Sequence, residues 1–305
     1  MCPIRLQKGD AIGMPVKTNA EYTDLLEKLQ DIPTLPLVAV RVNELINDPN
    51  SSSADIAQVL KKDQVLTAKV LRLVNSSYYA IPGGVTDVQR ALAFLGFNTI
   101  AQLVLSISVF SMFTRWGGAE LSMLDFWRHA LATGVCSELL ARRLKHPKPE
   151  EAFTCGLLHD IGKLVLHEVD PERLDAIIRA AKERNCSFSE IEKEWDLPGH
   201  SYLGEVIAIR WGLPQVIRLA VRHHHQDVSR MDTILASAKP VIHIVRLANQ
   251  IVVKNRIGKS GDFSDGKITP DMLSNTGIRE ADLPEIEVEL AKNIERAGAF
   301  LNAYR

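Results

Sequence analysis

Cysteines are scarce in this chain of 305 residues, and acidic and basic residues nearly balance. The four cysteines lie far apart and form no Cys-x-x-Cys pair, unlike the disulfide framework of a small secreted domain. A formal net charge of −1 gives no global basic field for nucleic acid or an anionic membrane. The first twenty residues lack the apolar segment of a signal peptide. These absences predict a cytoplasmic protein with reduced thiols and with no membrane or nucleic-acid partner.

Strand patterns are also rare, whereas helical patterns recur along the whole chain. Hydrophobic residues make up 46% of the sequence and charged residues 24%, which is ordinary for a globular protein. The length suits one large domain or two modest ones. Apolar residues repeat at helical spacing, and we see no internal repeat or low-complexity tract. The sequence therefore predicts an all-α helical bundle.

We expect the chain to divide into four parts. Residues 1–20 read as an irregular arm, residues 21–120 as an N-terminal helical part, residues 121–255 as a helical core, and residues 256–305 as a loop and C-terminal helical extension. Helical spacing and breaks predict helices over residues 21–30, 38–46, 125–144, 151–166, 172–183, 201–211, 238–253 and 283–304, with others starting near 53, 65 and 214. Residues 257–267 are expected to form a mobile loop.

Local patterns indicate how several of these helices begin and which faces they bury. The run Ser51–Ser53 followed by Asp55 is typical of a capped helix start, and Asp125 is the expected cap of a later helix. The apolar faces predicted for the two helices after residue 51 consist of Ile56, Val59 and Leu60, and of Val65, Ala68, Leu71 and Val74.

One uncharged segment, between Arg90 and Arg115, is long enough to cross a bilayer. Gly96 and Asn98 interrupt it, and several glutamine and serine residues dilute its hydrophobicity. We interpret it as the end of one helix over residues 89–95 followed by a second helix capped by Asn98. Two helices buried in a large core fit this pattern better than a membrane span.

Histidines occur in places where they could hold a metal ion. His129 lies on an apolar stripe, His159 and Asp160 are adjacent, His200 follows a Pro-Gly break, and residues 223–225 are three histidines at a helix end. Neutral imidazoles and a carboxylate are good ligands for divalent transition metals, and a metal with open positions lowers the pKa of a bound water. Lys163 could lie on the same side of a helix as Asp160 and hold a phosphate.

Each of these features also has an ordinary structural interpretation. A single histidine on an apolar stripe is more often a hydrogen-bonded core residue, and a histidine triplet is often a solvated helix end. A lysine such as Lys163 is usually a surface residue. His146, His167 and His243 are read in this ordinary way, and Cys155 as a core residue. Only the order of the set, with all members on predicted helices, favours a site.

This order resembles the HD superfamily of metal-dependent phosphohydrolases, which is all-helical. By this resemblance, His129 in Phe-Trp-Arg-His-Ala-Leu corresponds to the first histidine ligand of the family. His159 and Asp160 correspond to the His-Asp pair that gives the family its name. Lys163 corresponds to the lysine that often follows the pair.

The later ligands also have counterparts under this resemblance. His200 corresponds to the next histidine, and His224 and His225 look like the paired histidines of the branch that binds more than one metal. Helical spacing alone leaves open whether His223 or His224 points inward. The resemblance implies one or two divalent ions, with iron, manganese, zinc and nickel all suited to an imidazole-rich site.

A closer resemblance is to the HDOD domain, the HD-related output domain of bacterial signalling proteins. It covers residues 27–225 and rests on four segments: Leu-Pro-Leu at 35–37, Lys-Asp-Gln-Val-Leu-Thr-Ala-Lys-Val-Leu-Arg-Leu-Val-Asn-Ser at 62–76, Val-Gln-Arg-Ala-Leu-Ala-Phe-Leu-Gly-Phe at 88–97, and Gly-Leu-Leu-His-Asp-Ile-Gly-Lys at 156–163. It implies an HD-like helical bundle with an N-terminal helical subdomain.

The sequence departs from the HD pattern at two places. The late aspartate ligand of the family has Asn249 as its counterpart, and a neutral amide is a poorer metal ligand than a carboxylate. Asp227 is a candidate for supplying the carboxylate instead. The Asp-Gly-x-Gly-Tyr-Pro stretch of the HD-GYP phosphodiesterases does not follow His225, which argues against that activity.

Two functions from different classes follow from the resemblance. The first is a signalling output module that contacts protein partners through helical surfaces, with any bound metal structural or sensory. The second is a metal-dependent phosphohydrolase acting on a nucleotide or other phosphate ester. In the second, the histidines and Asp160 hold the metal for attack on phosphorus, and Lys163 stabilises charge on the phosphate.

Overall fold

The computed structural model describes residues 27–29, 32–113 and 120–302, and this part of the chain contains helices and no strand. The prediction of an all-α fold is therefore confirmed. The predicted arm, and most of the predicted helix over residues 21–30, lie outside the described residues. The boundaries proposed for the four parts of the chain stay a prediction.

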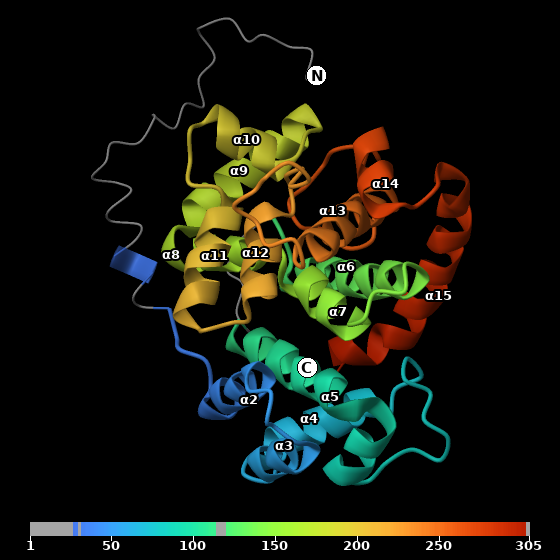
Figure 1. Cartoon of the computed structure of the whole chain (residues 1–305). Helices are drawn as coiled ribbons and strands as arrows, with labels where there is room; N and C mark the ends of the chain where they lie inside the picture. Colours follow the sequence, from blue (N-terminus) through green and yellow to red (C-terminus); the bar gives the residue numbers. More distant parts are fainter. Residues whose placement is uncertain (1–26, 30–31, 114–119, 303–305) are drawn as a thin grey trace, which may run out of the picture.

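Four helices form the N-terminal part, shown in blue to teal in Figure 1: α2 (Leu37–Asn47), α3 (Ser53–Leu60), α4 (Gln64–Val74) and α5 (Val88–Met112). The first three all pack against α5. Helix α3 begins as predicted, because the Asp55 carboxylate accepts hydrogen bonds from the backbone N–H (2.9 Å) and the hydroxyl (2.6 Å) of Ser52. Its predicted apolar face is buried.

Helix α4 buries a different face from the predicted one. Its N-cap is Asp63, whose carboxylate accepts a hydrogen bond from the Leu66 backbone N–H. With this start the buried residues are Leu66, Val70, Leu73 and Val74, whereas Val65 is 69% exposed. Two overlapping apolar stripes occur on this helix, and packing against α5 selects the second.

The long uncharged segment forms α5, which is broken at Gly96 (φ 80°, ψ 168°). The predicted division into two helices is confirmed, but the predicted cap is wrong, because Asn98 already has helical backbone angles. A positive φ is nearly free of strain only for glycine, so Gly96 sets the position of the break. This helix is long and apolar enough to cross a membrane, but its most apolar window is 61% buried within the fold, as expected for a core helix.

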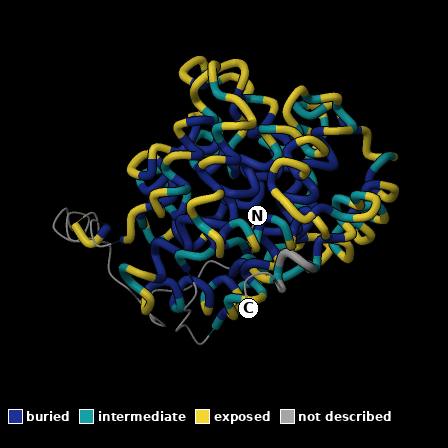
Figure 2. The backbone as a smooth tube through the Cα atoms, turned by 90° about the horizontal axis from the view of Figure 1, so that it is seen from below, coloured by how far each residue is buried: buried dark blue, intermediate teal, exposed yellow. Residues whose placement is uncertain are grey.

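The helical core consists of α6 (Met123–Arg143), α7 (Pro149–Leu158), α8 (Ile161–Val169), α9 (Pro171–Arg184), α10 (Phe188–Glu194), α11 (His200–Arg210), α12 (Gln215–His223) and α13 (Lys239–Lys254). Helix α6 packs against α7 and α13, and α11 packs against α8 and α12. Figure 2 shows the buried backbone concentrated in the interior of the molecule and the exposed backbone at its periphery.

Two predicted boundaries in the core are wrong. Ser122, not Asp125, caps α6, since its hydroxyl accepts the hydrogen bond from the Asp125 backbone N–H. The single helix predicted over residues 151–166 is two helices that meet at His159 and Asp160. Asp160 has φ −98° and ψ 12°, which ends regular helical geometry there.

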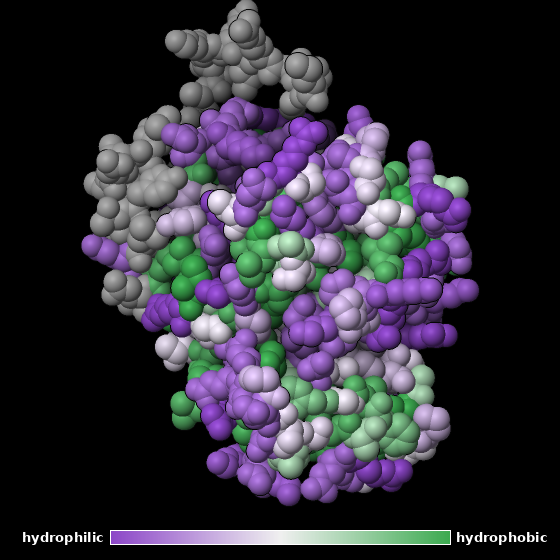
Figure 3. Space-filling model, in the orientation of Figure 1, coloured by the Kyte–Doolittle hydropathy of each residue, from purple (hydrophilic) through white to green (hydrophobic). Residues whose placement is uncertain are grey.

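The C-terminal extension contains α14 (Pro270–Thr276), the short 3₁₀ helix η2 (Glu280–Asp282) and α15 (Leu283–Asn302). Helix α15 packs against α6 and also contacts α4, so it touches both helical parts. The loop predicted as mobile is irregular but packed, because Lys259 N–H donates to Asp125 O (3.0 Å) and Phe263 N–H to Cys186 O (3.1 Å). On the face in Figure 3, hydrophobic residues form several groups separated by hydrophilic ones.

Candidate metal centre

The site is built around the break between α7 and α8. His159 and Asp160 occupy the two positions of this break, and both are buried. The start of α8 touches the start of α11 so closely that a Cβ added to Gly162 would lie 1.7 Å from the carbonyl oxygen of His200. Only glycine allows this contact, which places His200 beside Asp160.

Asp160 lies at the centre of the site. It contacts side chains from α6, α8 and α11, from the break before α8 and from the end of α12. Its Oδ2 is 3.3 Å from His159 Nε2 and 3.9 Å from His129 Nε2. Its Oδ1 is 3.2 Å from His200 Nε2 and 3.5 Å from His224 Nε2. The two carboxylate oxygens therefore face two different groups of imidazoles.

Hydrogen bonds behind three of the histidines fix their tautomers. Nδ1 of His159 lies 2.7 Å from Gly156 O, and Nδ1 of His224 lies 2.8 Å from Val221 O. A carbonyl oxygen can only accept, so each Nδ1 carries a proton, and in the neutral ring each Nε2 presents a lone pair. This arrangement is typical of metal-ligating histidines, whose second nitrogen donates to a carbonyl or carboxylate.

His200 has a carboxylate in the same position. Its Nδ1 lies 2.8 Å from Glu192 Oε2, and its backbone N–H donates to Glu192 Oε1 (2.5 Å). Glu192 is buried at the end of α10 and holds both the ring and the backbone of His200. Sequence reasoning missed Glu192, because an eight-residue separation across a turn gives no recognisable spacing.

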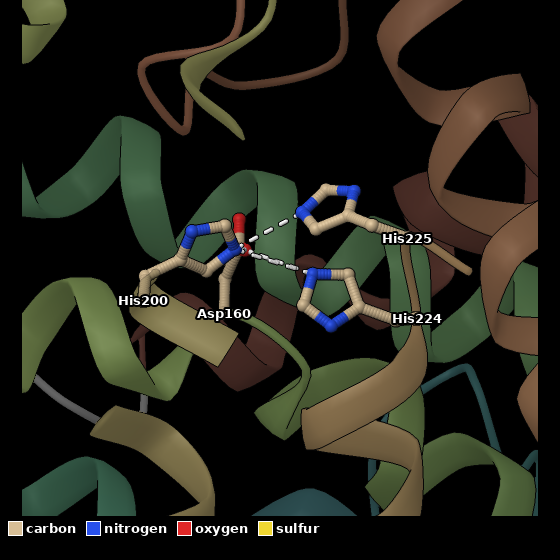
Figure 4. Close-up of side chains that lie close together, drawn as sticks. All are labelled: Asp160, His200, His224 and His225. Atoms are coloured by element: carbon tan, nitrogen blue, oxygen red, sulfur yellow. Dashed lines mark hydrogen bonds and ion pairs between the residues drawn. The ribbon is translucent and has the colours of Figure 1, made fainter. Parts of the chain in front are cut away.

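The histidine triplet resolves into two inward residues and one outward residue. Figure 4 shows His224 and His225 directing ring nitrogens towards His200 and Asp160. The Nε2 of His225 is 3.0 Å from that of His200, and the Nε2 of His224 is 3.3 Å from it. His223 instead contacts Gln226 through Nδ1 (2.8 Å). The question left open by helical spacing is thus answered in favour of His224.

His129 reaches the site from the buried stripe of α6. Burial lowers its pKa to about 3, the neighbouring His159 contributes to this, and Asp160 and the nearby Asn249 oppose it. The predicted counterpart of the late aspartate is therefore beside His129, and Asn249 is itself buried. Asp227 is not at the site: its carboxylate accepts hydrogen bonds from Ser229 and Asn275 on the surface.

The charges within the site are arranged for cation binding. Burial would raise the pKa of Asp160, but His159 and Lys163 hold it well below its usual value, so Asp160 is ionised. Burial lowers the pKa of His224 to about 4 and holds that of His225 well below its usual value. For His200, burial acts in the same direction, but Glu192 and Asp160 outweigh it and raise the pKa.

The donor set fits a metal ion on structural grounds. His129 Nε2, His159 Nε2 and Asp160 Oδ1 are buried and have no hydrogen-bond partner, which is costly unless another group satisfies them. Two sets of possible ligand atoms, each within 4.8 Å of one another, share the aspartate: one contains His129, His159 and Asp160, and the other Asp160, His200, His224 and His225. Such a shared carboxylate fits one ion or a pair of ions.

Lys163 is not the surface residue that its type would suggest. It is 2% exposed, its Nζ lies 2.7 Å from Asp160 Oδ2, and it sits over the Phe188 ring. The predicted proximity of Lys163 and Asp160 is confirmed. His146, His167 and His243 are not among the possible metal ligands in the described part of the chain, and Cys155 is buried, as predicted.

Comparisons with known proteins agree with this architecture. A Treponema pallidum protein is 25% identical over 247 residues, covering 79% of this chain and 46% of that protein. The chain thus spans less than half the length of this curated relative. A Shewanella amazonensis structure provisionally named a phosphohydrolase is 25% identical, with TM-score 0.69 and coverage of 92% and 98% of the two chains.

A second solved structure, provisionally named a signal transduction protein of Marinobacter aquaeolei, shares the fold. It has TM-score 0.75 and 21% identity, and the match covers 93% of this chain and 66% of that one. The model of the HDOD domain family matches residues 32–227, close to the segment from which the resemblance was first inferred. With the helical fold, the His-Asp cluster and this match over more than half of its length, the chain belongs to the HDOD domain family.

Proposed function

We propose that this chain is a bacterial signal-transduction output module of the HDOD type whose core holds one or two divalent transition-metal ions. The observation that carries the proposal is the position of Asp160 between two groups of imidazoles whose lone pairs face it. Protein partners would bind the exposed helical surfaces, and the module would act in the cytoplasm.

The chain's own residues would divide the work of holding the metal. Asp160 would bridge the two imidazole groups, and Glu192 would keep His200 oriented. Lys163 would offset the negative charge of Asp160 whenever the site is empty. Bound metal would supply Lewis acidity, and the imidazole-rich donor set suits iron, manganese, zinc or nickel.

A metal-dependent phosphohydrolase is the second candidate. Two observations favour it: the donor set is complete enough for two ions, and a buried cation, Lys163, lies beside it. The relative from Shewanella carries a phosphohydrolase name, at 25% identity. In this function Asp160 holds the metal, Lys163 stabilises charge on the phosphate, and the substrate is a nucleotide or another phosphate ester.

Elemental analysis of the purified protein tests the metal site. We expect one or two equivalents of iron, manganese, zinc or nickel per chain, lost in His159→Ala because this substitution removes an oriented Nε2. His146→Ala is the matched control, since His146 lies outside the cluster and its Nδ1 accepts a hydrogen bond from the Lys148 backbone N–H. No metal in the wild type, even after reconstitution, would refute the proposal.

A phosphate-ester screen separates the two functions. Asp160→Ala should abolish metal binding under both, but only an enzyme would lose turnover with it. Asn249→Asp sharpens the comparison, because it restores a carboxylate beside His129. We expect tighter metal binding in this variant under both functions, and faster turnover only if the protein is a hydrolase.

A further inference from the structure

A small cavity opens beside the metal centre, between α6 and the loop that follows α13. Its volume is about 150 Å³, and its lining includes His129, Arg256, Lys259, Ser260, Asp262 and Phe263. Five of these six residues come from the loop, which lies outside the segment matched by the HDOD family. His129 lines the cavity and also belongs to the set of possible metal ligands, and Asp262 of the lining interacts electrostatically with Lys163 and Asp160 of that centre.

The loop wall of this cavity is firmly placed. A Cβ added to Gly258 would lie 2.3 Å from the backbone nitrogen of His129, so the loop backbone rests directly on α6. Backbone hydrogen bonds tie Lys259 to Asp125 and Phe263 to Cys186. The loop therefore forms a built wall of the cavity.

The charges on the cavity favour an anion. Arg256 and Lys259 are exposed, and neither forms an ion pair or side-chain hydrogen bond with any residue in the described ranges. The opposing charges are Asp160 of the metal centre and Asp262, whose Oδ1 already accepts hydrogen bonds from Ser264 N–H (3.0 Å) and its hydroxyl (2.7 Å).

The size of the cavity narrows the class of ligand. A volume of 150 Å³ is well below the roughly 300–1,000 Å³ of pockets that enclose whole drug-sized molecules. It has room for a few water molecules at about 30 Å³ each, or for one phosphoryl group. A nucleoside would have to remain outside.

We infer that this cavity binds a phosphoryl group, with Arg256 and Lys259 as its cationic ligands and the metal centre at its inner end. The guanidinium of Arg256 can donate two parallel hydrogen bonds to phosphate oxygens, and Lys259 adds a point charge. The group could belong to free phosphate or to an ester whose remainder lies in solvent. This inference rests on the proposed function and names the ligand class of the same site.

Calorimetric titration of the metal-reconstituted full chain tests the inference. Inorganic phosphate and adenosine 5′-monophosphate are titrated into wild type, the double variant Arg256→Gln/Lys259→Gln, and Lys267→Gln. Lys267 is an exposed lysine of the same loop that does not line the cavity, which makes it the matched control. We expect at least tenfold weaker binding of both probes to the double variant and unchanged binding to the control.

Metal content, measured in each sample, separates this inference from the proposed function. Two results would overturn this inference and leave the proposed function intact: metal-loaded wild type binds neither probe, or it binds both probes no more tightly than the double variant does. Wild type without metal overturns both. Binding of inorganic phosphate alone would identify free phosphate as the ligand, and binding of both probes the phosphoryl end of an ester.

Discussion

The N-terminal helices and the helical core that contains the candidate metal site are both well packed, but they bury different kinds of groups. In residues 32–113 the buried polar side chains are neutral: Asn43, Ser76, Gln102, Ser106 and Ser108. From residue 120 onwards the core buries six histidines as well as Glu138, Asp160, Lys163, Arg173 and Glu192. No acidic, basic or histidine side chain is buried in the described N-terminal helices.

The N-terminal helices are thus specified mainly by apolar packing, and the core also by contacts between buried charged and polar groups. Apolar burial is not directional, so the sequence of α4 offers two apolar stripes, and only packing against α5 decides which one is buried. Buried charges are stable only with closely placed partners, so the core depends on particular contacts. We therefore expect mutations in the N-terminal helices to change stability alone, and mutations in the core to change stability and metal binding together.

The largest effect is expected for Gly162→Ala. The added Cβ would lie 1.7 Å from His200 O and 2.8 Å from Gly204 N, and backbone atoms cannot move aside cheaply. We expect a loss of at least about 4 kcal/mol of unfolding free energy, or no folded protein, and loss of metal. Urea unfolding with elemental analysis measures both.

Gly298→Ala is the control for this substitution. Gly298 lies within α15 and has nothing within 4 Å of an added Cβ, so alanine should stabilise the helix by up to about 1 kcal/mol. If Gly162→Ala were as stable as Gly298→Ala and kept its metal, the close contact between α8 and α11 would not be essential to the site.

The site shows where sequence reasoning succeeds and where it stops. His129, His159, Asp160, His200 and the last two histidines of the triplet could be named in advance, because the order of residue types along the chain carries this information. Their ligand roles stay predictions, although the structure brings all six together.

What could not be predicted depends on contacts between distant segments. Glu192 supports His200 across a turn, and Asp262 of the C-terminal loop lines the cavity that His129 also lines. Helix breaks were also missed where a buried site requires them, as at Asp160, because an apolar helical pattern continues through the break. In α5, by contrast, the sequence did indicate a break. The predicted start of the second helix, at Asn98, lies two residues after the observed break at Gly96.

Acid should destabilise the metal-free core next most strongly. The pKa values of His129 (about 3) and His224 (about 4) are lowered by burial from 6.5, so the unfolded chain binds more protons below pH 6.5. Their stabilising contribution is complete above pH 6.5 and is lost as the pH falls towards 4. Each contributes about 1.4 kcal/mol per pH unit, so we expect a total slope above that value.

The titration of His200 and Asp160 does not oppose this loss of stability between pH 6.5 and pH 4. The raised pKa of His200 gives a contribution that is complete below pH 6.5 and is lost only at higher pH. The lowered pKa of Asp160 gives one that is lost only below about pH 3.8. Urea unfolding of chelator-treated protein at several pH values measures the slope; a flat profile between pH 6.5 and 4 would contradict neutral buried histidines.

Leu73→Ala tests the N-terminal half of the comparison. Leu73 is fully buried on α4, so the cavity left by alanine should cost about 3 kcal/mol. Val65→Ala on the same helix should change stability by less than about 0.5 kcal/mol, because Val65 is 69% exposed. We expect full metal content in both variants. Loss of metal in Leu73→Ala would show that the two halves are coupled.

The smallest expected effect, that of Glu192→Gln, tests the core most selectively. The substitution keeps the shape of the side chain and removes no ligand atom. Glutamine has one carbonyl oxygen, so it can accept from the backbone N–H or from Nδ1–H of His200, and its amide group would face the other donor. Losing the partner behind a ligating histidine typically costs tenfold to a hundredfold in metal affinity.

Competition with a chelator measures this affinity, and Glu194→Gln is the matched control. Glu194 lies on the same helix, is exposed and pairs only with Arg184, so its loss should leave metal affinity unchanged. A tenfold or greater weakening in Glu192→Gln alone would show that the core needs the groups behind its ligands as well as the ligands. Equal affinities in the two variants would mean that packing alone orients His200, and the core would then resemble the N-terminal helices more closely than its buried charges suggest.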